Sequence, residues 1–453
     1  MKTRYEVKQQ IVPGPKGHWL QGNLPEFKND PLQFLMNQSN QYGEISRFRF
    51  GPFQQVYFVN DPVLIKEVLV TKQKSFIKSR DIQMLKTVVG EGLLTSEKEV
   101  HMKQRRLIQP AFKKTHIAQY AQDMINTTSS YIEGWSNGEK KSITNEMMNI
   151  ALGIITKTMF SMDIGEESKR IEAPMEAVMK LGVKRMRSLI TIPLWIPTKN
   201  NRKLKRAVKE LDDVLFSIIK ERRMEPSEHT DLLGILMQAK DEENGLGMTD
   251  KQLRDELMTI FLAGHETTAN LLSWTFYLLS QHPEVDEKLY TIIEELTQGK
   301  PITPELYPQL TYAQHIISES MRLYPPAYVI GRQVEEDIEI GPYQMRKGDM
   351  VLISQYVMHR NPTYYDNAEA FIPERFEHNF IKTLPTYAYF PFGGGPRVCI
   401  GNHFAMMEAT LALATIVQKY RLTLSADHHT VKPQPLVTLR PKRGLYMTLN
   451  NRK

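Results

Sequence analysis

Residues 392–401 have the sequence Phe392-Gly393-Gly394-Gly395-Pro396-Arg397-Val398-Cys399-Ile400-Gly401. Three successive glycines and a proline predict a loop of defined shape, because glycine reaches backbone conformations that other residues avoid and proline fixes φ. We expect Cys399 to lie where the next helix begins, and the N-terminus of a helix favours a thiolate. The stretch therefore predicts a loop that presents a reactive thiolate. A plain glycine-rich turn before a helix is the alternative.

Cys399 is the only cysteine among 453 residues. The chain therefore has no internal disulfide and no zinc or iron–sulfur site built from several cysteines. A reducing compartment is the natural setting for such a chain. Residues 1–12 carry four charged side chains and no stretch has about 18 consecutive apolar residues, so we expect no signal peptide, no membrane anchor and a cytoplasmic location.

The formal charge of +7 and the pI near 9.1 favour acidic partners. Nucleic acid is one candidate, but the chain has no dense run of Lys and Arg with interleaved aromatic residues and no recognised binding motif. The composition, with 41% apolar and 24% charged residues, is that of an ordinary globular protein. We therefore expect an acidic protein partner and no nucleic acid.

Outside the cysteine stretch, short β-like runs at 45–50 and 55–59 are followed by mostly helical spacing from about 98 to 290. Asp61 and Pro62 open a helix, and short strands return at 337–340 and 350–354. The fold class is therefore mainly α with small β-sheets (α+β). We expect a single domain over 1–453, with an α-rich body at about 61–325 and 400–420 and β-rich parts near 40–60, 325–360 and the C-terminus.

The longest predicted helix spans about residues 252–281, which at ~1.5 Å per residue is about 45 Å long. Few of its positions are polar, so it should run through the core. Its middle nevertheless reads Ala263-Gly264-His265-Glu266-Thr267-Thr268. Polar side chains in a buried helix need partners, so we expect compensating contacts there.

Residues 392–401 resemble the cysteine loop of the cytochrome P-450 family, Phe-x-x-Gly-x-Arg-x-Cys-x-Gly. The resemblance implies a triangular, α-rich body with a long central distal helix. It also implies a haem-thiolate monooxygenase in which Cys399 is the axial ligand of haem b, iron protoporphyrin IX. The middle of the long helix resembles the family's oxygen-binding pattern. By that resemblance Thr267 orders water during dioxygen activation and Glu266 feeds protons towards the oxygen.

The same resemblance assigns further residues. Glu319 and Arg322 match a Glu-x-x-Arg helix motif and, with Arg375, would form a buried network that sets the cysteine loop. Gly401 leaves room for a flat ring to approach, and Arg397 can pair with an anionic cofactor edge. The other cofactor-binding residues are His101, Arg105, Arg332 and Phe392.

The substrate pocket is expected to be mainly apolar, so a hydrophobic small molecule is the predicted substrate. Fatty acid, terpenoid, steroid and polyketide all remain open, with a long-chain fatty acid preferred. We expect no flavin- or iron–sulfur-binding extension after residue 453, and therefore electrons from a separate acidic flavodoxin, ferredoxin or flavin reductase, docked near Lys103, Arg106, Lys113 and Lys114. The residues expected to line the pocket are Leu85, Phe261, Ala263, Ala327, Val329 and Val437.

Several alternatives compete with the monooxygenase. A haem-thiolate sensor has no use for an acid–alcohol pair, and a peroxide-driven hydroxylase or an oxygen-independent isomerase tends to lack the acid or the threonine. A hydrolase based on Cys399 and His403 has no evident third group. A zinc-protease His-Glu-x-x-His motif is excluded because Ala269 occupies the second histidine position.

Overall fold

The computed structural model describes residues 11–162, 192–224, 230–241, 245–426 and 431–452, together with residues 174, 175, 177, 178, 180–182, 185 and 243. The chain forms two compact units. The first comprises Met1–Arg80 and Met321–Cys399, and the second comprises Asp81–Ser320 and Ile400–Lys453. Most of the charged N-terminal segment considered above lies outside the described residues. The expectation of one domain stays a prediction.

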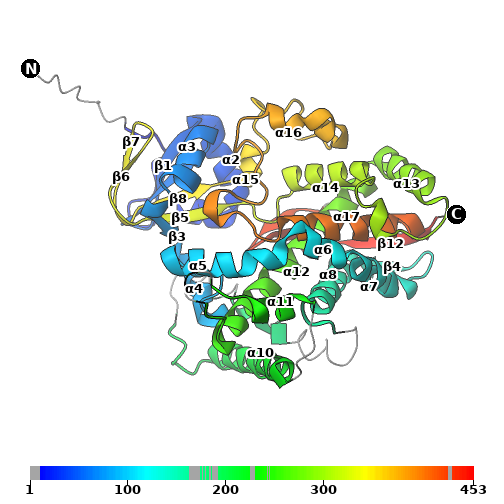
Figure 1. The fold of residues 1–453 in the computed structure, drawn as a ribbon. Coiled ribbons are helices and arrows are strands. Elements are labelled where there is room, and N and C mark those ends of the chain that lie inside the picture. The colour runs from blue at the N-terminus through cyan, green and yellow to red at the C-terminus, as the bar shows by residue number, and fades with distance from the viewer. Residues whose placement is uncertain are drawn as a thin grey trace, which may run out of the picture. The chain divides into compact units, whose positions relative to one another are not determined.

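The first unit is built on a five-stranded sheet with the strand order β1-β2-β8-β5-β3 (Figure 1). β1 and β2 form an antiparallel hairpin at the two predicted β-like runs, β8 pairs with β2 in parallel, and β5 and β3 extend the sheet in antiparallel fashion. The strands are β1 (Ile45–Phe50), β2 (Gln54–Val59), β3 (Phe76–Lys78), β5 (Ile330–Val334) and β8 (Met350–Ile353).

The helices of the first unit are short, and the predicted start at Asp61 and Pro62 is confirmed. The Asp61 carboxylate accepts hydrogen bonds from the backbone N–H groups of Val63 and Leu64, and Pro62 occupies the first turn. The remaining elements are α1 (Leu24–Asn29), α2 (Pro31–Tyr42), α3 (Pro62–Lys66), η1 (Glu67–Thr71), η2 (Gln73–Ser75), β6 (Ile338–Ile340), β7 (Tyr343–Met345), α15 (Gln355–Met358), η5 (Pro373–Asn379), α16 (Phe380–Thr383) and η6 (Gly395–Arg397).

The second unit is mainly helical, and its longest helix, α12 (Asp250–Gln281), confirms the predicted long helix. A capping box between Thr249 and Gln252 starts α12, and Pro283 starts the next helix directly after it ends. α12 packs against α8 (Ile143–Phe160) (Figure 1). Gly264 makes this approach close, because an added Cβ would crowd the Ile155 side chain.

The rest of the second unit consists of further helices and two small sheets. In these sheets β12 pairs with β4 and β9, and β10 pairs with β11. No helix of the described residues is long and apolar enough to cross a membrane. The predicted α+β class is confirmed. The elements are α4 (Arg80–Val89), α5 (Lys98–Ile108), η3 (Gln109–Phe112), α6 (Lys114–Gln119), α7 (Ala121–Glu133), β4 (Lys140–Ser142), α10 (Lys199–Met224), α11 (Leu232–Gln238), α13 (Pro283–Thr297), η4 (Pro304–Leu306), α14 (Thr311–Leu323), α17 (Asn402–Lys419), β9 (Tyr420–Leu424), β10 (Pro433–Pro435), β11 (Leu439–Pro441) and β12 (Tyr446–Asn451).

Candidate active site

The cysteine loop of the first unit has the defined shape that its glycines predict. Gly393 and Gly395 have φ angles of 73° and 66°, a region that favours glycine. A Cβ on Gly395 would collide with the carbonyl oxygen of Leu69, and one on Gly394 would collide with the Tyr387 ring. Glycine is therefore required here by the fold itself.

Cys399 closes this loop and remains exposed. Its backbone N–H donates to the carbonyl of Phe392 at 2.9 Å, and the N–H of Val398 donates to the carbonyl of Gly395 at 3.0 Å. The following helix, α17, begins at Asn402, so Cys399 lies in the loop just before that helix. The thiol is thus held by a hydrogen-bonded turn and stays accessible to a ligand.

Behind this loop, Arg322 of the Glu-x-x-Arg motif is fully buried. Its guanidinium donates to three backbone carbonyls, those of His359 at 2.9 Å, Ala368 at 2.6 Å and Ala370 at 2.8 Å. Arg375 lies in the same unit and stacks over the Tyr365 ring, which Arg322 also contacts. The Arg322 side chain therefore ties the segment around residues 359–370 together, whereas the role expected for Glu319 stays a prediction.

His359 continues this support towards the cysteine loop, although no motif in the sequence singles it out. Its Nε2 accepts a hydrogen bond from the backbone N–H of Phe390 at 2.9 Å, and the carbonyl of Phe390 accepts one from the N–H of Gly393. Burial, helped by the nearby Arg322 charge, lowers the pKa of His359 to about 3, so the ring is neutral and can accept. Arg322 and Gly393 are thereby joined through His359 and Phe390.

In the second unit, the polar residues in the middle of α12 have the expected compensating contacts. Glu266 is buried, and its Oε1 accepts a hydrogen bond from the Thr438 hydroxyl at 2.6 Å. The Thr438 oxygen in turn accepts from the Asn270 side-chain amide at 3.0 Å. The other carboxylate oxygen of Glu266, Oε2, is buried and receives no hydrogen bond from the described residues.

The neighbours of Glu266 point in different directions. Thr267 is half-buried, and its hydroxyl donates to the carbonyl of Ala263 at 2.6 Å. Thr268 donates instead to the buried carboxyl of Glu408 on α17 at 3.0 Å. Burial raises the pKa of Glu408 to about 8 and lowers that of His265. Thr438, Asn270 and Glu408 are partners that sequence reasoning did not assign, because only the fold brings their segments to α12.

The predicted cofactor-binding residues fall in both units. In the second, His101 is buried with Nδ1 at 3.2 Å from the carbonyl of Leu93, and Arg105 is half-buried on the same helix, α5. An added Cβ on Gly401 would meet only Phe112, at an ordinary 3.7 Å. In the first unit, Arg332 donates to the carbonyl of its neighbour Gly331. Half-buried Arg397 and Phe392 also lie in this unit.

The predicted substrate-pocket residues differ in exposure. Leu85 and Phe261 are buried in the main core of the second unit, where the Phe261 ring stacks on that of Phe160, while Ala263 on α12 is exposed. Val437 is half-buried next to Thr438. In the first unit Ala327 is exposed, and half-buried Val329 packs against a cluster of buried hydrophobic side chains. The role of these six residues in binding substrate stays a prediction.

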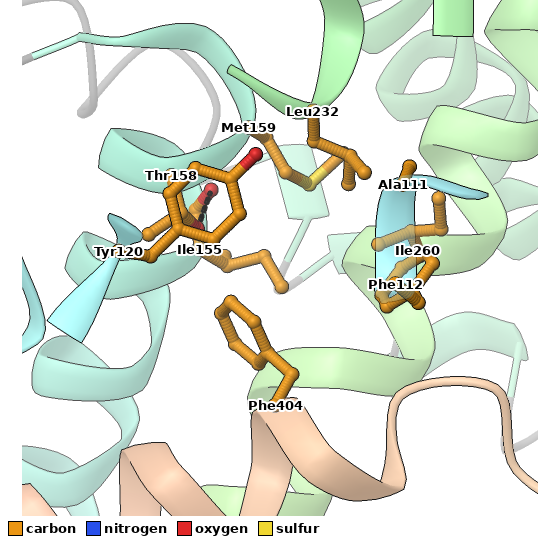
Figure 2. A pocket seen from close by; sticks show the side chains of 9 residues that line it. All are labelled: Ala111, Phe112, Tyr120, Ile155, Thr158, Met159, Leu232, Ile260 and Phe404. Atoms are coloured by element: carbon orange, nitrogen blue, oxygen red, sulfur yellow. Dashed lines mark hydrogen bonds between the residues drawn. The ribbon is translucent and has the colours of Figure 1, made fainter. Parts of the chain in front are cut away.

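Figure 2 shows an apolar cavity inside the second unit, with Phe404 and Tyr120 on its walls and Thr158 as its other polar residue. Its volume of about 20 Å³ leaves room for little more than one water molecule. It is therefore too small for an organic substrate. Its lining is completed by Ala111, Phe112, Ile155, Met159, Leu232 and Ile260.

Comparison with known proteins identifies the family. Residues 12–448 match the model of the family described as Cytochrome P450. The chain is 34% identical over 404 residues to the cyclooctat-9-en-7-ol 5-monooxygenase of Streptomyces melanosporofaciens, covering 89% of this chain and 87% of the relative. It is 31% identical to the cyclooctatin synthase of the same organism, covering 97% and 94%. It is also 31% identical to the pentalenene oxygenase of Streptomyces avermitilis, covering 95% of each. The chain therefore belongs to the cytochrome P450 family and is a monooxygenase.

Proposed function

We propose that this monooxygenase binds haem b through the Cys399 thiolate and inserts one oxygen atom from dioxygen into a hydrophobic, terpene-like substrate. The observation that carries the proposal is the accessible thiol of Cys399 at the end of a rigid loop. When bound, the haem supplies the binding and activation of dioxygen. Cys399 supplies the sulfur ligand on which that chemistry depends.

The donor set fits a haem better than a free metal ion. No group of three or more His, Cys, Asp and Glu residues that could hold a metal ion occurs in the described part of the chain. A free ion such as zinc needs three or four protein ligands. A porphyrin brings four nitrogen donors of its own and needs only the single thiolate that the loop presents. His101, Arg105, Arg332 and Arg397 would then pair with its carboxylates.

Glu266 and Thr267 are proposed to move protons in this reaction. A buried carboxyl with one unoccupied oxygen can take up and release a proton at that atom, Oε2. The Thr267 hydroxyl donates to its own helix, so its oxygen can accept a hydrogen bond from water or from the reacting group. The pair favours a monooxygenase over a peroxide-driven hydroxylase or a sensor, which need no directed proton delivery.

A terpene is preferred over the fatty acid expected from the sequence. Two of the relatives are named for monooxygenation of cyclooctat-9-en-7-ol and for oxygenation of pentalenene. The endings of both names denote unsaturated hydrocarbon skeletons, one of them with a single hydroxyl group. The apolar character of the expected pocket residues is compatible with such a substrate.

An acidic electron donor is proposed to dock near Lys113 and Lys114. Both side chains are exposed. Burial, followed by the nearby Lys114 charge, lowers the pKa of His403 at the start of α17, which places Lys114 close to that imidazole. The docking surface is narrower than expected, because Lys103 pairs with Asp241 at 3.3 Å and Arg106 pairs with Glu243 at 2.9 Å. Reversing the charges of Lys113 and Lys114 should slow reduction by the donor at low salt.

The function is tested on the haem-loaded protein. The reduced carbon monoxide complex should show the red-shifted Soret band of a thiolate ligand, and Cys399→His should lose both this band and oxygenation. Pentalenene should shift the spin state of the iron more strongly than palmitic acid does. A native complex without the thiolate-type band would refute the role of Cys399, and a stronger response to palmitic acid would refute the terpene assignment.

A further inference from the structure

We propose that Thr438, itself held by Asn270, is a positioning residue that fixes the Glu266 carboxyl and confines its exchangeable proton to Oε2. The inference rests on the proposed function, because it presupposes that Glu266 moves protons. It adds to that function the residue that orients the acid. The three side chains lie within the second unit, two of them on α12 and Thr438 just before β11.

The direction of each hydrogen bond follows from the chemistry of the three groups. The Asn270 nitrogen, Nδ2, can only donate, so the Thr438 oxygen accepts at 3.0 Å. When Glu266 is ionised its oxygens can only accept, so the Thr438 hydroxyl proton is donated to Oε1 at 2.6 Å. Oε1 then already accepts a hydrogen bond, which favours Oε2 as the oxygen that takes up a proton. Among the described residues Oε2 has no hydrogen-bond partner, so this oxygen is the one available for transfer.

The segment that carries Thr438 is anchored to the same face of α12. Glu266, Asn270 and Trp274 are spaced by four residues, which places them one above the other on one helix face. The Trp274 indole donates to the backbone carbonyl of Leu439 at 3.0 Å, and both residues are fully buried. The segment that carries Thr438 is therefore held to α12 at two points, through the Thr438 hydroxyl and through the Leu439 carbonyl. The group that orients the carboxyl is thus itself fixed.

A single substitution can separate a positioning role of Thr438 from a purely structural one. A valine at this position keeps the size and branching of threonine and removes only the hydroxyl. It leaves Oε1 of Glu266 without its donor, so the carboxyl is free to rotate and either oxygen can carry the proton. Proton delivery should then suffer while haem binding and folding persist.

The test compares Thr438→Val, Thr438→Ser and Glu266→Gln in the haem-loaded protein, reduced in air by a ferredoxin and its reductase. Two electrons and two protons convert dioxygen into hydrogen peroxide, whereas four of each convert it into two water molecules. Impaired proton delivery therefore raises the share of electrons recovered as peroxide. We expect Thr438→Val to raise the peroxide-to-water ratio about threefold. Thr438→Ser should restore it, and the thiolate-type Soret band should be unchanged in both.

A matched control is Thr275→Val, which removes a buried hydroxyl of the same helix that donates only to the backbone carbonyl of Leu271. It should leave the peroxide ratio unchanged. In a Glu266→Gln background, Thr438→Val should add nothing further. An added increase there would overturn the inference, because Thr438 would then act independently of Glu266.

The failures of the two hypotheses are distinguishable. If Glu266→Gln raises the peroxide ratio and Thr438→Val does not, the positioning role is refuted and the proposed role of Glu266 stands. If Glu266→Gln itself leaves the ratio unchanged, the proton-transfer role of Glu266 is refuted and the inference falls with it.

Discussion

The cysteine loop of the first unit and the middle of α12 in the second are both supported by buried ionisable side chains, but in different ways. Behind the loop, Arg322 and His359 bond to backbone atoms. On α12, Thr438 and Thr268 bond to the carboxyls of Glu266 and Glu408. Every residue has a backbone carbonyl, and every residue except proline has a backbone N–H, so a backbone partner does not depend on the type of residue. A side-chain partner requires a particular residue at a particular position. The loop support therefore tolerates more sequence change than the helix support.

The two regions also respond to pH in opposite directions. The pKa of His359 falls from 6.5 to about 3, so folding loses stability as the pH drops below 6.5 and the unfolded chain takes up a proton. The pKa of Glu408 rises from 4.5 to about 8, so folding loses stability as the pH rises above 4.5 and the unfolded chain gives up a proton. Both groups therefore lower the stability between pH 4.5 and pH 6.5, whereas near neutral pH the cost comes mainly from Glu408.

The largest effect is expected from Arg322→Leu, which leaves one buried and two partly buried carbonyls without their donor. We expect a loss of about 3–5 kcal/mol in the free energy of unfolding, together with loss of haem, measured by urea denaturation and the Soret absorbance. Arg360→Leu is the control, because that buried arginine donates to one carbonyl and to the exposed carboxylate of Glu369. Equal losses in the two variants would contradict the special role of Arg322.

The sequence predicted the parts of both regions that depend on local rules. The glycines of the cysteine loop, the long helix and the first β-hairpin follow from backbone preference and apolar spacing. The need for compensating contacts in the middle of α12 also followed, because Glu266 and the two threonines are costly in a buried helix. These features can be predicted without knowing which distant segments of the chain lie next to them in the fold.

The partners themselves could not be predicted from local rules. Thr438 lies 172 positions from Glu266 along the chain and Glu408 lies 140 from Thr268. The sequence contains many other threonines and glutamates, and no local feature marks these two as the hydrogen-bond partners. His359 carries even less signal, because its imidazole bonds to a backbone N–H that every residue except proline provides. Pairing of this kind is decided by tertiary packing.

A smaller effect is expected from Glu408→Gln. The amide keeps an acceptor for the Thr268 hydroxyl but cannot ionise, so it removes the penalty that grows with pH. The free energy of unfolding of the variant, relative to that of the native protein, should rise by on the order of 3 kcal/mol between pH 4.5 and pH 7. Thermal or urea unfolding at each pH measures this difference. Glu295→Gln, at an exposed position on α13, should show no such gain. A constant difference between Glu408→Gln and the native protein across this pH range would show that Glu408 does not titrate abnormally.

The smallest effect is expected from His359→Gln, on the acid side of the same profile. The Gln side-chain oxygen can accept from the N–H of Phe390, but the amide takes up no proton when the protein unfolds. Between pH 6.5 and pH 5, the free energy of unfolding of the native protein should therefore fall by on the order of 2 kcal/mol more than that of the variant. Urea unfolding at each pH measures this difference. His359→Leu should show the same shallow pH dependence with a further constant loss of about 1–3 kcal/mol, because the buried N–H then has no acceptor. If the free energy of unfolding of His359→Gln changed with pH as steeply as that of the native protein, another group would be responsible for the acid sensitivity. The two regions would then not differ in their response to pH.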